Sequence, residues 1–416
     1  MKELITPDLW PNFEADDLSL IKRLAFGSSR PLAAGDGQAK IFKELNYFFP
    51  NRKIFLFTSK NFALEFLLKF YFQRSQRRQV LIQAFSSFVW PKAIMAAGGQ
   101  PIFLDLGENS LNFDLESLKK KISDRVGILI TQNTFGQPND LSQIIPLTRE
   151  NKILLIENIS DCFGSKFQDR FLGNFGDVAL LGFGQADAVS SLSGAALIFN
   201  QPFLAAEFDL FYQKLAYPSA FWIRRRLLSS LAMSGFRRRY FNGGKIGLNF
   251  FRKFKLAPAE ISLDKKNGKR LNQFKTKMPN AFALIGFNQI RKLVRLNDHR
   301  RQLGQIYLNQ GLLPFGDYSV EANFYYLRYP ITLNEPKKII AAMRSRGVYL
   351  GDWYQSVLFP LIKRFDRFNY YYGDAPRAET LSRLIYNLPT NILTRPDQAY
   401  FLVDELKRTI QREKFV

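Results

Sequence analysis

The sequence has almost none of the residues from which cysteine- and histidine-based sites are built. Its 416 residues include one cysteine, Cys162, and one histidine, His299. A single cysteine excludes an internal disulfide bond and a cysteine-built metal site. Because no histidine is available to activate it, we expect Cys162 to be a small buried residue. His299 lies among basic residues in RLNDHRR and is interpreted as a solvated helix residue. We therefore expect neither a histidine-based catalytic triad nor a metal site.

Long apolar runs are also absent. No stretch of the sequence reaches the roughly 20 apolar residues that a membrane-spanning helix needs. The first residues, MKELITPDLWPNFEADD, carry acids and prolines where a signal peptide needs an uninterrupted apolar segment. We expect a cytoplasmic protein, which in one of the interpretations below is peripheral to the inner face of the membrane.

Acidic residues are scarce relative to basic ones. The chain has 59 Lys and Arg against 36 Asp and Glu, which gives a formal net charge of +23. The excess is concentrated between residues 213 and 277, which contain 17 basic residues and two acids. Aromatic residues are interleaved with two arginine triplets in this segment. The arginines are Arg224, Arg225, Arg226, Arg237, Arg238 and Arg239.

The sequence is compatible with three functions for this basic segment. Basic and aromatic residues together are typical of helices that lie on an anionic membrane surface. The same composition occurs in nucleic-acid binding, which is less favoured because no nucleic-acid motif accompanies it. An acidic partner protein or an anionic glycan is the third. The alternative to all three is a solvated basic face around a dimer interface.

Apolar strands alternate with helical segments through the first half of the chain. We predict strands at 54–59, 80–85, 101–106, 126–133, 153–157 and 178–183, and helices at 61–72, 114–122 and 142–151. This alternation predicts an α/β fold with right-handed βαβ units and a mostly parallel sheet. We expect a large α/β domain at 1–204, a basic aromatic insert or interface region at 205–279, and a helix with a smaller C-terminal α+β domain at 280–416.

Several stretches carry a family resemblance through their order and spacing. They are VLIQAFSSFVWPKAIMAAGGQPIFLDL, FGQPNDLSQI, GNFGDVALLGF, NAFALIGFNQI, RGVYLGDWY and YNLP. Together they resemble the DegT/StrS family of nucleotide-sugar aminotransferases, which use pyridoxal phosphate (PLP) on a fold-type I scaffold. The resemblance covers nearly the whole chain except about residues 205–270. It implies a dimer with pockets at the subunit interface, formed by two identical chains or with an active paralogue.

The resemblance fails at the catalytic lysine. In the family a lysine forms a Schiff base with the PLP aldehyde, about four residues after a Ser-Phe pair at a strand end. Here the pair reads Gly182-Phe183, and the fourth residue on is Asp187, which has no amine. The surrounding loop, QADAVSSLSG, contains no lysine. The resemblance thus implies PLP as cofactor, whereas these residues predict that its covalent binding is lost.

Other positions that contact the cofactor in the family also differ. Asn158 stands where an aspartate pairs with the pyridine nitrogen, and a neutral amide cannot hold the positive charge of the ring by ion pairing. Asp161 stands where the family usually has Gln or His. The stacking aromatic ring aligns with Ser87 in the pair Ser86-Ser87, and a serine that contacts the phosphate becomes Gly182.

The phosphate-binding Ser-Gly-Thr of the family reads Ser59, Lys60 and Asn61 in this sequence. A residue that reaches in from the partner subunit, usually Asn, aligns near Lys275. The changed positions define what we call the former cofactor pocket. Its residues are Lys60, Asn61, Ser86, Ser87, Asn158, Asp161, Gly182 and Asp187.

Lys60 and Asp187 carry opposite charges in this pocket. We hypothesise that they form an ion pair or a hydrogen-bonded cluster, with Asp161 as a further member, because partnered charges are tolerable in a cavity where single ones are costly. The alternative is that both face solvent in an open cleft. A further interpretation retains a ligand, with Lys60 and Asn61 at a helix start holding a phosphate or the diphosphate of a nucleotide sugar.

These residues leave it open whether the protein is an enzyme. The main interpretation is a degenerate member of the family that acts as a binding or scaffolding subunit in surface-polysaccharide or nucleotide-sugar metabolism. The alternative is an active sugar aminotransferase, or another nucleotide-sugar enzyme, that works by a non-standard route.

Overall fold

The computed structural model describes residues 5–6, 11–27, 31–238, 243–244, 246–247, 275–316, 322–334, 336–362 and 364–413. A seven-stranded sheet forms the middle of the fold, in the order β1-β10-β9-β6-β5-β2-β4. Its strands are β1 (Lys53–Phe57), β2 (Gln79–Gln83), β4 (Gln100–Leu104), β5 (Val126–Gln132), β6 (Leu154–Asn158), β9 (Val178–Gly182) and β10 (Ala195–Phe199).

The sheet is mostly parallel. Strands β9, β6, β5, β2 and β4 run parallel to one another, and β10 is antiparallel to both of its neighbours, β9 and β1. Every residue of β9 and β10 is buried. Such continuous apolar strands are what a sheet covered on both faces requires. The predicted α/β fold and its strand positions are therefore confirmed.

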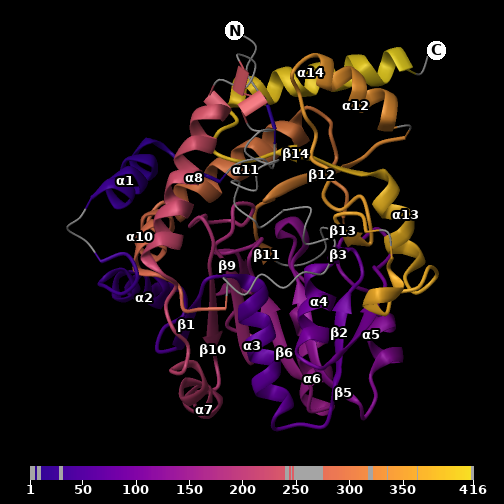
Figure 1. Cartoon of the computed structure of the whole chain (residues 1–416). Helices are drawn as coiled ribbons and strands as arrows, with labels where there is room; N and C mark the ends of the chain where they lie inside the picture. The colour runs from indigo at the N-terminus through magenta and orange to yellow at the C-terminus, as the bar shows by residue number, and fades with distance from the viewer. Residues whose placement is uncertain are drawn as a thin grey trace.

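Helices cover both faces of the sheet (Figure 1). Helices α3 (Lys60–Phe72), α4 (Val89–Ala96) and α7 (Pro202–Tyr212) pack on one face, in a cluster that takes Leu180 from β9 and Leu197 from β10. The other face takes Leu181 and Ile198 from the same strands. Its helices are α1 (Ala15–Phe26), α2 (Gly37–Phe48), α5 (Leu115–Lys121), α6 (Leu141–Glu150) and α10 (Asn280–Ile290), with α8 (Ala220–Arg238) beside α1.

A third hydrophobic cluster forms the smaller C-terminal region. Strands β12 (Arg328–Thr332) and β14 (Ile385–Pro389) pair antiparallel in it. Helices α11 (Leu293–Asn309), α12 (Pro336–Ser345) and α14 (Pro396–Glu413) surround this pair, and α13 (Pro376–Leu384) leads into β14. The short elements are β3 (Ser86–Ser87), β7 (Lys166–Phe167), β8 (Arg170–Phe171), β11 (Ala322–Asn323), β13 (Leu358–Phe359) and the 3-10 turns η1 (Thr134–Gly136) and η6 (Asp366–Phe368).

Two predictions about single residues have different outcomes. Cys162 is fully buried, as expected. The prediction that His299 is solvated is wrong, because its ring is partly buried and Nε2 lies 2.9 Å from the carbonyl oxygen of Thr394. Burial lowers the pKa of His299. In the described part of the chain no helix is both long and apolar enough to cross a membrane.

Candidate functional site

The carboxyl ends of β6 and β9 lie side by side and are joined by Ser160. The Ser160 hydroxyl donates to Oδ1 of Asn158 over 2.7 Å and accepts from the backbone N–H of Gly182 over 2.9 Å. The backbone N–H of Ser160 also approaches the same Asn158 oxygen, at 3.3 Å. Asn158 is buried, so its side-chain oxygen is engaged within the protein.

Glu157, next to Asn158, holds the glycine turn that leads into β9. Its carboxylate accepts from the backbone N–H groups of Gly173 at 2.9 Å, Phe175 at 2.7 Å and Gly176 at 2.5 Å. Burial raises the pKa of Glu157, although these three donors act in the opposite direction. We assign this carboxylate a role in shaping the loop because these three hydrogen bonds all come from the loop backbone.

Lys60 and Asp187 form an ion pair in the former cofactor pocket. Lys60 Nζ lies 2.7 Å from Oδ1 of Asp187, and the two side chains are 25% and 9% exposed. Ser59 accepts from the backbone N–H of Phe62 at the start of α3. This cap makes Lys60 the first residue of the helix. The hypothesis of an ion pair is confirmed, and the alternative that both side chains face solvent is wrong.

Gly182 leaves the space that Asp187 occupies. A Cβ atom at position 182 would lie 2.1 Å from Oδ2 of Asp187 and 3.0 Å from the Ser160 hydroxyl. The same Oδ2 accepts from the backbone N–H of Gly184 over 2.7 Å. A serine at position 182 is therefore incompatible with this position of Asp187. The residue types at positions 182 and 187 are in this way physically coupled.

Asp161 lies close to this pair and is partly buried. Burial raises the pKa of Asp161, and the nearby Asp187 carboxylate adds to the increase, while the positive charges of Arg328 and Lys60 oppose it. Arg328 lies with its guanidinium 4.6 Å from the ring centre of Trp353. The pocket thus combines two carboxylates with two cations.

Three buried arginines hold the segment that carries Asp187, residues 184–193, which we call the Asp187 loop. They donate to its backbone carbonyl oxygens. Arg226 of α8 bonds to Leu192 at 3.3 Å, Arg300 of α11 to Ala188 at 2.6 Å and Arg328 of β12 to Ala186 at 2.8 Å. Their exposed fractions are 7%, 1% and 4%, so the loop is fixed from three separate elements.

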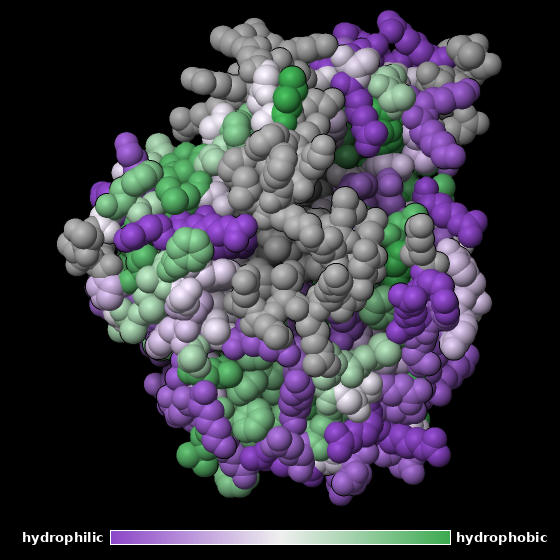
Figure 2. All heavy atoms as spheres, in the orientation of Figure 1, coloured by the Kyte–Doolittle hydropathy of each residue, from purple (hydrophilic) through white to green (hydrophobic). Residues whose placement is uncertain are grey.

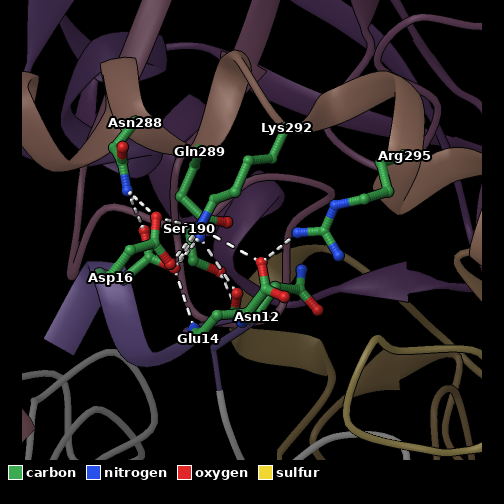
Figure 3. A network of polar contacts seen from close by, with 9 residues as sticks. Asn12, Glu14, Asp16, Ser190, Asn288, Gln289, Lys292 and Arg295 are labelled. Atoms are coloured by element: carbon green, nitrogen blue, oxygen red, sulfur yellow. Dashed lines mark hydrogen bonds and ion pairs between the residues drawn. The ribbon is translucent and has the colours of Figure 1, made fainter.

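Lys292 and three acids join α1 to the turn between α10 and α11 (Figure 3). Its ammonium lies 3.3 Å from Glu14, 3.0 Å from Asp16 and 2.6 Å from Asp17. We call these four residues the Lys292 cluster. The three carboxylates are spaced as metal ligands would be, but the ammonium already balances part of their charge. The cluster is therefore explained by helix packing.

Hydrogen bonds connect the Lys292 cluster to the Asp187 loop. Gln289 Nε2 donates to Asp17 at 2.8 Å and to the carbonyl oxygen of Asn12 at 3.1 Å. Asn12 in turn donates its side-chain amide to the carbonyl oxygen of Ala188 and its backbone N–H to Ser190, both over 3.4 Å. Figure 3 shows Asn12, Gln289 and Ser190 in this arrangement. The N-terminal segment thus also supports the loop.

The remaining predicted pocket residues make local contacts. Ser86 and Ser87 form β3, which pairs with β13. Ser86 donates its hydroxyl to the carbonyl oxygen of Gln83, and the Ser87 hydroxyl accepts from a nearby backbone N–H. Asn61 is partly buried in the first turn of α3. Lys275 pairs with Glu65 of α3 over 3.0 Å.

The six arginines of the basic segment differ in their surroundings. Arg224 and Arg225 are exposed on α8, and Arg237 is partly buried. Arg226 does not belong on the proposed anionic-binding face, because it is buried and bonded to the Asp187 loop. The side chain of Arg238, and Arg239 as a whole, lie outside the described residues.

Two of the arginines that hold the Asp187 loop were not found by sequence reasoning, and the third, Arg226, was assigned to another surface. Arg300 and Arg328 lie in an ordinary helical segment and an ordinary strand, and no motif marks them. A cavity of about 210 Å³ lies apart from the predicted pocket, beside the start of α6. Asn112, Gln137 and Asp140 are among its lining residues, and no predicted site residue borders it.

The residues around Asp187 do not match the set that holds PLP covalently in the family. Asp187, which the sequence comparison aligns with the family's lysine, carries no amine, and the amine of Lys60 is paired with its carboxylate. The oxygen of Asn158 is engaged by Ser160. An amide also lacks the charge that keeps a pyridine nitrogen protonated.

Comparison with known proteins gives one family. The model of the DegT/DnrJ/EryC1/StrS aminotransferase family matches residues 27–407. Among curated proteins, GDP-perosamine synthase of Escherichia coli O157:H7 is 24% identical over 126 residues, which cover 30% of this chain and 35% of that protein. The matched segment thus spans about a third of that relative.

Solved structures share the fold over the whole chain. The aminotransferase PseC of Helicobacter pylori, involved in pseudaminic acid biosynthesis, superposes with a TM-score of 0.74 at 15% identity and covers 99% of this chain and 100% of its own. Spr1654 of Streptococcus pneumoniae, in its PLP form, gives a TM-score of 0.75 at 12% identity and covers 98% of this chain and 99% of its own.

Proposed function

Because the chain belongs to the DegT/DnrJ/EryC1/StrS aminotransferase family, we propose that it binds a nucleotide sugar without covalently held PLP, as a non-catalytic subunit of nucleotide-sugar metabolism. The observation that carries this proposal is the 2.7 Å ion pair between Lys60 and Asp187 at the place of the family's lysine. An ammonium paired with a carboxylate has no lone pair for attack on an aldehyde. The only amine that reaches Asp187 in the described part of the chain is thus occupied.

The coupling between Asp187 and Gly182 supports the same proposal. Asp187 bonds both Lys60 and the backbone of Gly184, and it uses space that exists because position 182 has no side chain. These contacts give the carboxylate a structural task inside the pocket. They favour a site that has been rebuilt around an ion pair over one that has lost a single catalytic residue.

An active enzyme is the second candidate function. It is supported by the relatives, among them GDP-perosamine synthase of E. coli O157:H7, and by the reach of Lys60 into the pocket. In this candidate the Lys60 amine takes the place of the missing lysine after it separates from Asp187. A partner chain, either a second copy or an active paralogue, fits both candidates.

Titration calorimetry with GDP-, UDP- and dTDP-hexoses, combined with a transamination assay, tests the proposal. We expect saturable binding of at least one nucleotide sugar, and no amino-sugar product when PLP, an amino donor and a 4-keto sugar nucleotide are supplied. Binding of none of them would contradict the proposal. Product formation that is lost in Lys60→Met would establish the second candidate instead.

A further inference from the structure

Helix α8 presents an exposed face of basic and apolar side chains. Phe221, Arg224, Arg225 and Leu228 follow the spacing i, i+3, i+4 and i+7, which places them on one side of a helix. Phe221 is 80% exposed, Leu228 is 40% exposed, and both arginines are exposed. We call these four residues the α8 face.

The opposite side of α8 fixes the helix to the protein. Ile223 and Leu227 are fully buried in the main core cluster. Trp222 packs against Phe282 of α10, with 5.7 Å between the ring centres. Because Arg226 also bonds to the Asp187 loop, the orientation of α8 is set from inside and the α8 face is held outward.

The composition of the α8 face is unusual for a helix surface in contact with water. Helix α8 contains no Asp or Glu along its length, whereas solvated helix faces normally carry both signs of charge. A single exposed Phe is ordinary, but here Phe221 and Leu228 flank two exposed arginines on the same face. Apolar and basic side chains together are what an interfacial helix uses, with the ring among the lipid chains and the guanidinium groups at the phosphates.

Helix α1, which packs against α8, also exposes basic and apolar side chains in its C-terminal half, while its first turn carries the acids of the Lys292 cluster. Helix α1 lies beside α8 (Figure 1) and exposes Lys22, Arg23 and Phe26 (70%). Figure 2 shows hydrophobic and hydrophilic side chains next to each other over the region of α1 and α8. The net charge of the chain, +23, favours an anionic partner over a neutral one.

We propose that the α8 face binds the surface of an anionic lipid bilayer, so that the protein is held peripherally at a membrane. Phe221 and Leu228 enter the boundary between headgroups and acyl chains, while Arg224 and Arg225 pair with lipid phosphates. A nucleic acid matches the charge, but the phosphate backbone offers no apolar layer for Phe221 and Leu228. The lipid surface therefore accounts for both the apolar and the basic side chains of the α8 face.

Vesicle co-sedimentation of the full chain tests the proposal. We expect binding to vesicles of phosphatidylcholine with 30% phosphatidylglycerol, and at least about tenfold weaker binding to phosphatidylcholine alone or in 0.5 M salt. The double variant R224E/R225E should lose at least about tenfold. The control K407E/R408E makes the same charge change at two exposed residues of α14 and should bind within twofold of wild type.

A second pair of variants tests the apolar half. Phe221→Ser should weaken binding to anionic vesicles several-fold, and Phe203→Ser, which alters a residue of α7 that is 78% exposed, should leave it unchanged. Circular dichroism melts establish that all variants are folded. No binding by the wild type, or equal loss in R224E/R225E and K407E/R408E, would overturn the proposal. So would binding of duplex DNA or RNA by the wild type without any binding of anionic vesicles.

Discussion

Neutralising both members of the Lys60–Asp187 pair should destabilise the protein by less than the sum of the two single losses. Lys60→Met removes the ammonium but keeps an apolar stem of similar length. Asp187→Asn removes the negative charge but keeps an oxygen that can accept from the Gly184 N–H, which now bonds Asp187 at 2.7 Å. The two changes therefore isolate the charge interaction from the shape of the pocket.

The expected magnitude follows from the burial of the pair. Removing one partner of a buried ion pair costs about 3–5 kcal/mol. Asp187 is 9% exposed but Lys60 is 25% exposed, so we expect about 2 kcal/mol for each single variant. The double variant should lose about 2.5 kcal/mol, which leaves a coupling energy of about 1.5 kcal/mol between the two side chains.

Urea unfolding of the four proteins, in low salt and in 1 M NaCl, measures this coupling. The exposed pair Lys40–Asp36, at 2.5 Å and with side chains 42% and 62% exposed, is the control. Its coupling should be below about 0.5 kcal/mol and should vanish in high salt. Additive losses at Lys60 and Asp187, within about 0.3 kcal/mol, would refute the claim that this pair stabilises the pocket.

Three further predictions follow from the same structure. Gly182→Ser should destabilise the protein by about 2 kcal/mol, because a Cβ atom there lies 2.1 Å from Asp187; in an Asp187→Ala background the loss should fall below about 1 kcal/mol, and an equal loss in both backgrounds would refute the coupling. Lys292→Met leaves the fully buried Asp17 without its cation and should cost about 3 kcal/mol at neutral pH in urea unfolding. Burial raises the pKa values of Glu14 and Asp16, but hydrogen bonds and nearby positive charges outweigh this effect. The pKa of Glu14 is therefore held below its ordinary value of 4.5, and that of Asp16 below 3.8. Their contribution is therefore complete above those values and is lost as the pH falls through the lowered pKa values, so the difference in stability between wild type and Lys292→Met should shrink below about pH 4, and a constant difference would argue against the cluster. Cys162 is buried and its pKa is raised well above the ordinary value, first by burial and then by nearby carboxylates; it should react with a thiol reagent at the rate of unfolding in urea, and fast labelling of the native protein would contradict its burial.

The sheet could be predicted from the sequence because its signals are local. Strands such as Val178–Gly182 are continuous apolar runs, and each is bounded by turn residues that end it. The Lys60–Asp187 pair could be proposed because the resemblance aligned two residues of opposite charge with one pocket. The strands and the ion pair could both be predicted because the fold itself determines which of these residues become neighbours.

The supports of the Asp187 loop could not be predicted, because they depend on contacts between distant segments. Arg300 and Arg328 are separated from the loop by more than 100 residues. The arginine triplet at 224–226 shows that, even within one helix, the sequence alone did not tell which side chain is buried. Consecutive helical residues differ by about 100°, so three arginines in a row cannot all point to solvent. Arg226 is the one directed inward.

Treatment of the purified protein with PLP and borohydride shows whether any lysine still forms a Schiff base with the cofactor. We expect no absorbance of a lysine-bound PLP, and no lysine-containing peptide carrying the reduced adduct in mass spectrometry. Lys60 is the residue to inspect first, because its amine lies 2.7 Å from Asp187. A stoichiometric adduct on Lys60, or on any other single lysine, would contradict the claim that covalent binding of the cofactor has been lost.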